Sequence, residues 1–156
     1  MRSEAAVTIV SALALLFHPT GATAFDSILK TPKVRVGEKA PIAESLEKPR
    51  EEGRAVVLVL FPNPTRCGGC EMTTAAIGEA AKKHPGVAFV MLGGGDKLGA
   101  MDEETAVVRR LYGFVTTGEA MTFFIDDRGI LRKIITGGYN GPALEGMLES
   151  LKWADK

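Results

Sequence analysis

Three short apolar runs constrain what this 156-residue chain can fold into more than any other feature of its sequence. Residues 55–61 and 87–92 are apolar without alternation, which predicts strands covered on both faces of a sheet. Residues 121–125 predict a third strand, and the turn residues 126–129 join it to a hairpin partner at 130–135. At least four strands are therefore expected in one sheet.

Helical spacing of apolar residues separates these runs and closes the chain. A helix is predicted from Cys70 to the residue before Pro85, a second over 103–112, and a last one over 142–153. The order strand, helix, strand, helix, hairpin, helix predicts an α/β fold with a mixed central β-sheet and helices on both faces.

Two segments ahead of the first apolar run carry weaker signals. Residues 34–36 predict a short edge strand. Residues 45–54 are charged and contain Pro49 and Gly53, so they are predicted to form a surface connection.

The N-terminus has the pattern of an export signal. An apolar run at 5–17 follows Arg2, and the small residues Ala22-Thr23-Ala24 offer a cleavage site after Ala24. The run is shorter than the roughly 20 residues that span a bilayer, which argues against an uncleaved membrane anchor. We therefore predict a signal peptide at 1–24, one domain at 25–156, and a periplasmic location.

Composition excludes several functional classes. Lysine and arginine together number 19, as do aspartate and glutamate, and no basic patch indicates nucleic-acid binding. His84 is the only histidine after the predicted signal, and its place before Pro85-Gly86 predicts an exposed helix end. A catalytic Cys-His pair and a closed zinc site within one chain are both unsupported.

Cys67 and Cys70 are the only cysteines, and they lie between the first strand and the first long helix. Two thiols at this spacing can close a disulfide or bind one soft metal ion. The start of a helix favours the thiolate through its unpaired N–H groups and its dipole. This placement favours redox chemistry over a structural cross-link.

The motifs resemble those of the thioredoxin superfamily, in particular its exported TlpA-like and peroxiredoxin-like branch. The similarity is carried by 36–41, by 56–61 with Cys67-Gly-Gly-Cys70, and by 123–129. It implies a thioredoxin-like fold and a thiol:disulfide oxidoreductase that needs no cofactor. It also implies that Cys67 attacks a protein disulfide, that Cys70 resolves the intermediate, and that a membrane thiol carrier supplies electrons.

Several positions depart from that pattern near the cysteines. Arg66 replaces the usual tryptophan and either supports the Cys67 thiolate or is a solvated surface charge. Gly68 and Gly69 stand where the family commonly has a proline. Leu60 occupies the buried strand position that often carries an acid for proton transfer.

A further departure lies in the loop that the family places opposite its dithiol. Alignment puts Ala120 at the position of the family's cis-proline, so the Glu119–Ala120 peptide is predicted to be trans. In the family this loop pairs with the substrate backbone. Glu119 and Ala120 are therefore the expected substrate-docking residues, in an altered setting.

Other functions remain open from the sequence. The same cysteines, with the thioether of Met121 or Met72, are suited to a cuprous ion in a non-catalytic copper-binding or metal-delivery module. A redox-inert binding domain is a third possibility. A thiol peroxidase is less well supported, because the spacing from Pro62 through Thr65 to Cys67 is shorter than its signature.

Overall fold

A computed structural model of the chain describes residues 32–62, 67–93, 102–114 and 118–153. Four strands form one sheet in the order β2-β1-β3-β4. β1 pairs with β2 in parallel and with β3 antiparallel, and β4 is antiparallel to β3. The predicted mixed sheet is confirmed. The elements are α2 (Glu44–Glu51), β1 (Ala55–Leu60), α3 (Cys70–Lys83), β2 (Val87–Leu92), α4 (Glu103–Tyr112), β3 (Met121–Ile125), β4 (Leu131–Thr136) and α5 (Gly141–Ser150).

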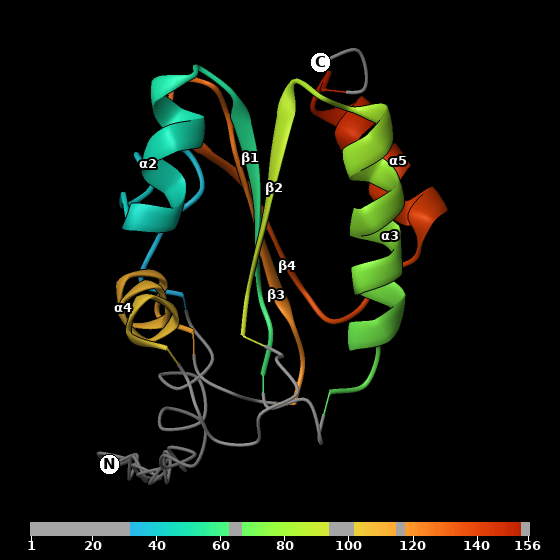
Figure 1. The fold of residues 1–156 in the computed structure, drawn as a ribbon, viewed down its shortest axis with the longest axis horizontal. Coiled ribbons are helices and arrows are strands. Elements are labelled where there is room, and N and C mark those ends of the chain that lie inside the picture. Colours follow the sequence, from blue (N-terminus) through green and yellow to red (C-terminus); the bar gives the residue numbers. More distant parts are fainter. Residues whose placement is uncertain (1–31, 63–66, 94–101, 115–117, 154–156) are drawn as a thin grey trace, which may run out of the picture.

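Helices cover both faces of the sheet, as the order of elements predicts. In Figure 1 the sheet is seen nearly edge-on, with α2 and α4 on its left and α3 and α5 on its right. Two clusters of buried side chains fill the two interfaces. All six residues of β1 are buried, and they alternate between the clusters, which explains why this strand has no polar position.

The helix ends follow from local sequence. Asp102 caps α4, because its carboxylate accepts a hydrogen bond from the Thr105 N–H at 2.7 Å. Gly113 ends the same helix in a left-handed conformation. Asn140 caps α5 by accepting from the Ala143 N–H at 3.0 Å.

Two predictions for the segments before β1 were wrong. Residues 34–36 form no strand. A turn at Gly37 comes next, and the chain then meets the start of β4 through an isolated bridge between Lys39 and Ile130. The charged segment contains the helix α2, which includes Pro49. Leu46 is 1% exposed and packs this helix into the buried cluster on the α2 and α4 face, so the helix forms despite Pro49.

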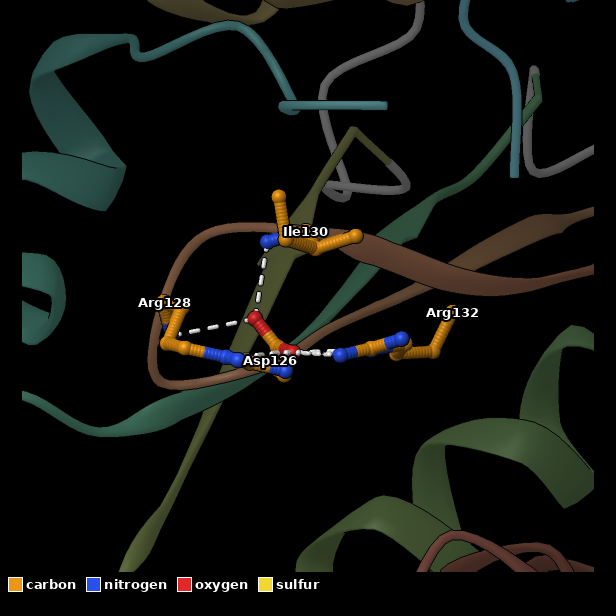
Figure 2. A network of polar contacts seen from close by, with 4 residues as sticks. All are labelled: Asp126, Arg128, Ile130 and Arg132. Atoms are coloured by element: carbon orange, nitrogen blue, oxygen red, sulfur yellow. Dashed lines mark hydrogen bonds and ion pairs between the residues drawn. The ribbon is translucent and has the colours of Figure 1, made fainter. Parts of the chain in front are cut away.

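A buried carboxylate fixes the turn between β3 and β4 (Figure 2). Asp126 Oδ1 accepts hydrogen bonds from the N–H groups of Arg128 at 3.0 Å and Ile130 at 2.8 Å. Its Oδ2 lies 2.7 Å from Nε and 2.6 Å from Nη2 of Arg132. This network lies at the end of the sheet where Val56 pairs with Ile125.

The predicted signal at 1–24, its cleavage after Ala24, and residues 25–31 of the predicted domain lie outside the described residues. Across the parts of the chain that are described, no helix has the length and apolar character needed to cross a membrane.

Candidate active site

Cys67 and Cys70 are joined by a disulfide, with their Cα atoms 5.6 Å apart. Both cysteines are half-buried, and Gly68 between them is exposed. The bridge lies where β1 has ended and α3 begins, so it is at the carboxyl end of the central strand. This is the edge of an open α/β sheet at which ligands commonly bind.

Gly69 occupies the N-cap position of α3 and has a φ of 92°, in the left-handed region. With no side chain, it cannot supply the cap that serine or aspartate would give. No side chain of the N-cap residue therefore accepts a hydrogen bond from the first N–H groups of α3. Helix N–H groups and the helix dipole at this end favour an anion, such as a cysteine thiolate.

The segment between β4 and α5 touches the dithiol loop through backbone alone. A Cβ atom built on Gly138 would lie 2.9 Å from both the Cα and the carbonyl oxygen of Gly69. A Cβ atom on Gly69 would lie 3.1 Å from the Cα of Gly138. These distances exclude side chains from the contact unless the backbone moves.

Residues 137–139, which we call the glycine strap, also bind the sheet and the helix α3. The Gly137 N–H donates to the carbonyl of Ala120 at 2.8 Å. The Tyr139 N–H donates to Thr73 Oγ1 at 3.2 Å. The strap therefore connects the residue before β3 to the first turns of α3 and passes over Gly69 between these two anchors.

Tyr139 secures the strap from within the core. Its side chain is 6% exposed, and its hydroxyl lies 3.1 Å from Thr122 Oγ1, which donates to it. Burial raises the pKa of Tyr139, although the hydrogen bond from Thr122 opposes that shift. The phenol therefore stays protonated at neutral pH.

The predicted docking residues lie at the start of β3. Ala120 is fully buried and belongs to the cluster against which Cys70 packs, whereas Glu119 is exposed. The Glu119–Ala120 peptide is trans, as the alanine predicts. The carbonyl of Ala120 is already paired with the glycine strap, since it accepts the bond from Gly137.

Arg66, the predicted thiolate-supporting residue, lies outside the described residues. Another arginine acts at the same edge of the sheet: Arg109 of α4 donates a hydrogen bond to the carbonyl of Phe61, directly after β1. Its guanidinium carbon lies 5.0 Å from the ring centroid of Phe114. Arg109 therefore fastens the start of the segment that leads to Cys67.

Replacing Arg109 with methionine should lower the free energy of unfolding by about 1–2 kcal/mol, because a hydrogen bond to a partly buried carbonyl and a cation–π contact are both lost. Urea unfolding followed by circular dichroism measures this change. The exposed neighbour Arg110, replaced in the same way, is the control and should change stability by less than about 0.5 kcal/mol. Equal losses in both variants would contradict the role given to Arg109.

The methionines named as thioether donors are placed differently. Met121 belongs to the cluster on the α2 and α4 face, whereas Cys70 packs against the cluster on the α3 and α5 face. Met72 is 46% exposed on the first turn of α3. Among the described residues, no group of three or more histidine, cysteine, aspartate or glutamate side chains could hold a metal ion.

The prediction that His84 is exposed was wrong. His84 is 6% exposed, and its Nε2 lies 2.8 Å from a carboxylate oxygen of Glu145 on α5. The hydrogen bond with His84 lowers the pKa of Glu145 more than burial raises it. Helix packing between α3 and α5 buries the imidazole, a tertiary effect that the flanking Pro85-Gly86 does not reveal. It lies at the opposite end of α3 from Cys70.

Sequence reasoning missed the contribution of Gly138, Tyr139, Thr73 and Thr122. The adjacent glycines Gly137 and Gly138 are the one signal in the sequence, because glycine permits a close backbone approach. Which partner they approach depends on the tertiary fold.

The sheet order, the parallel β1–α3–β2 unit, the antiparallel β3–β4 hairpin and the cysteine pair before α3 define a thioredoxin-like fold that carries a Cys-x-x-Cys disulfide. No protein-family model matches the chain, and no curated protein matches it either. Solved structures with similarity to it include oxidized thioredoxin O2 from Arabidopsis thaliana, with 20% sequence identity and a TM-score of 0.47. That alignment covers 69% of this chain and 83% of the other.

Proposed function

We propose that the protein is an exported thiol:disulfide oxidoreductase that acts on protein disulfides, of the TlpA-like kind within the thioredoxin superfamily. The observation that carries this proposal is the Cys67–Cys70 disulfide at the N-terminus of α3, on the carboxyl edge of a thioredoxin-like sheet. The export pattern at 1–24 supports a periplasmic setting, where disulfides form and persist.

The reaction is a pair of thiol–disulfide exchanges. The Cys67 thiolate attacks one sulfur of the substrate disulfide, that bond breaks, and the released substrate thiolate takes a proton. Cys70 then loses its proton and attacks the Cys67 sulfur, which forms the Cys67–Cys70 bridge and releases the second substrate thiol. A membrane thiol carrier returns two electrons and two protons to the enzyme. No cofactor enters these steps.

Substrate docking uses the edge that the strap and β3 form. Glu119 is the exposed member of the docking loop, and the buried Ala120 fixes its position. Because Ala120 already accepts a hydrogen bond from Gly137, its carbonyl has one lone pair left for a substrate N–H. Arg66, one residue before Cys67, supports the thiolate with its charge.

The test is reduction of insulin disulfides with dithiothreitol as electron donor. Cys67→Ser should abolish turnover, since the attacking thiol is lost. Cys70→Ser should also abolish turnover. When the reduced variant is freed of dithiothreitol and mixed with insulin, it should accumulate a mixed disulfide at Cys67, detectable on a non-reducing gel. Wild-type turnover no faster than that of the double serine variant would contradict the proposal.

Copper binding is the alternative function, and the same experiment must distinguish it from oxidoreductase activity. The reduced protein is titrated with Cu(I) against a chelator of known affinity, beside the insulin assay. Met121 lies on the other face of the sheet from Cys70, so the arrangement does not favour a site made of both thiols and Met121. Tight copper binding without reductase turnover would favour the metal-delivery function.

A further inference from the structure

The contact between Gly138 and Gly69 is closer than a side chain at either position allows. Gly138 is far from the cysteines in sequence, and it lies against the backbone of the residue that precedes Cys70. Gly68, the other residue of the dithiol loop, has no atom within 4 Å of a Cβ built on it. The two glycines between the cysteines are therefore not equivalent.

While the disulfide is closed, neither Gly138 nor Gly69 can shift easily to make room for a side chain. The glycine strap is held on both sides, by the bond from Gly137 to Ala120 and by the bond from Tyr139 to Thr73. Gly69 lies inside the ring that the Cys67–Cys70 bridge closes. Reduction opens that ring and removes one constraint on Gly69, so the open loop should hold the strap less firmly than the closed one.

We propose that Gly138 is a positioning residue that sets the reduction potential of the dithiol through Gly69. By leaving room for Gly69 in its present conformation, Gly138 favours the disulfide form. A methyl group at 138 disfavours the closed ring more than the open one, so it raises the potential. The inference rests on the proposed function, because it concerns the same reversible disulfide.

The test is the equilibrium between the dithiol and glutathione, measured by thiol trapping in buffers of graded redox ratio. Gly138→Ala should shift the equilibrium about tenfold toward the reduced protein, which corresponds to about 30 mV for two electrons. Gly146→Ala adds a methyl group on α5, outside the dithiol loop, where nothing lies within 4 Å, and it should keep the wild-type midpoint.

The possible results distinguish a failure of this inference from a failure of the proposed oxidoreductase function. A wild-type protein with no reversible transition would overturn the proposed function. A reversible wild type with an unchanged midpoint in Gly138→Ala would overturn only the role of Gly138, because a merely structural glycine destabilises both redox states alike.

A second measurement needs no variant and so does not depend on its folding. Amide hydrogen exchange is followed in the oxidised and reduced wild-type protein. The amides of Gly137 and Tyr139, which bond to Ala120 and Thr73, should exchange more slowly in the oxidised form. Equal protection in both forms would contradict a coupling between the strap and the bridge.

Discussion

Gly69→Pro will destabilise the oxidised protein by at least about 3 kcal/mol, although it restores the proline that thioredoxin-like dithiols commonly have between their cysteines. Proline fixes φ near −65°, whereas Gly69 has a φ of 92°. The ring cannot reach this conformation, so the loop must be rebuilt. The new side chain would also press on Gly138, since even a Cβ atom lies 3.1 Å from its Cα.

Urea unfolding of the oxidised protein measures this loss. Gly68→Ala is the matched control, because Gly68 is exposed and a methyl group there meets nothing within 4 Å. It should alter the free energy of unfolding by less than about 0.5 kcal/mol. A Gly69→Pro protein as stable as wild type would show that this loop adopts another conformation in solution.

Asp126→Asn should lower the free energy of unfolding by about 3 kcal/mol, although it lies at the opposite end of β3 from the dithiol. Asp126 is 5% exposed, and its carboxylate accepts hydrogen bonds from two backbone N–H groups and from Arg132. Removing one member of a buried ion pair typically costs about 3–5 kcal/mol; the Arg132 side chain is 36% exposed, which places the loss at the low end.

Arg128→Gln is the control for that variant. The Arg128 side chain is 75% exposed, and its Nε lies 3.8 Å from the Asp126 carboxylate, so its ion pair contributes little. Thermal unfolding should separate the two variants clearly. Similar losses in both would mean that the turn depends on surface charge and not on the buried acceptor.

The contribution of Asp126 should also depend on pH. Burial raises the pKa of Asp126, but the hydrogen bond from Ile130 and those from Arg132 and Arg128 together lower it below its ordinary value. A carboxyl with a lowered pKa in the folded state stabilises the protein fully above the unfolded value, about 3.9, and loses this effect as pH falls through the folded value. The stability difference between wild type and Asp126→Asn should therefore shrink below about pH 4. A difference independent of pH would contradict an ionised Asp126.

Much of the sheet could be predicted because two features of the sequence identify its strands. These are their apolar composition and the turn-forming residues at their ends. β1 is apolar at every position and leads to Pro62, while β3 and β4 are joined by the turn residues after Asp126. α4 was predictable because Gly113 ends its apolar stripe. The position of the candidate site could be predicted from the spacing of Cys67 and Cys70 and from their place before α3.

Other features depend on contacts between distant residues, which local pattern cannot supply. α2 forms around the buried Leu46 despite Pro49, and His84 is buried by the packing of α5. The approach of Gly138 to Gly69 joins segments that are far apart in the sequence. A glycine in a sequence indicates that a close approach is possible but not with which residue.

The reversibility of the Cys67–Cys70 bridge, at a potential that thiol partners can reach, decides most directly whether this dithiol is catalytic. The full chain is equilibrated in glutathione buffers and dithiothreitol buffers, trapped, and its oxidised fraction is plotted against potential. We expect one two-electron transition with a midpoint less negative than about −300 mV, the range of thiol oxidoreductases and not of structural disulfides. A bridge that stays closed until well below that potential would contradict a catalytic role.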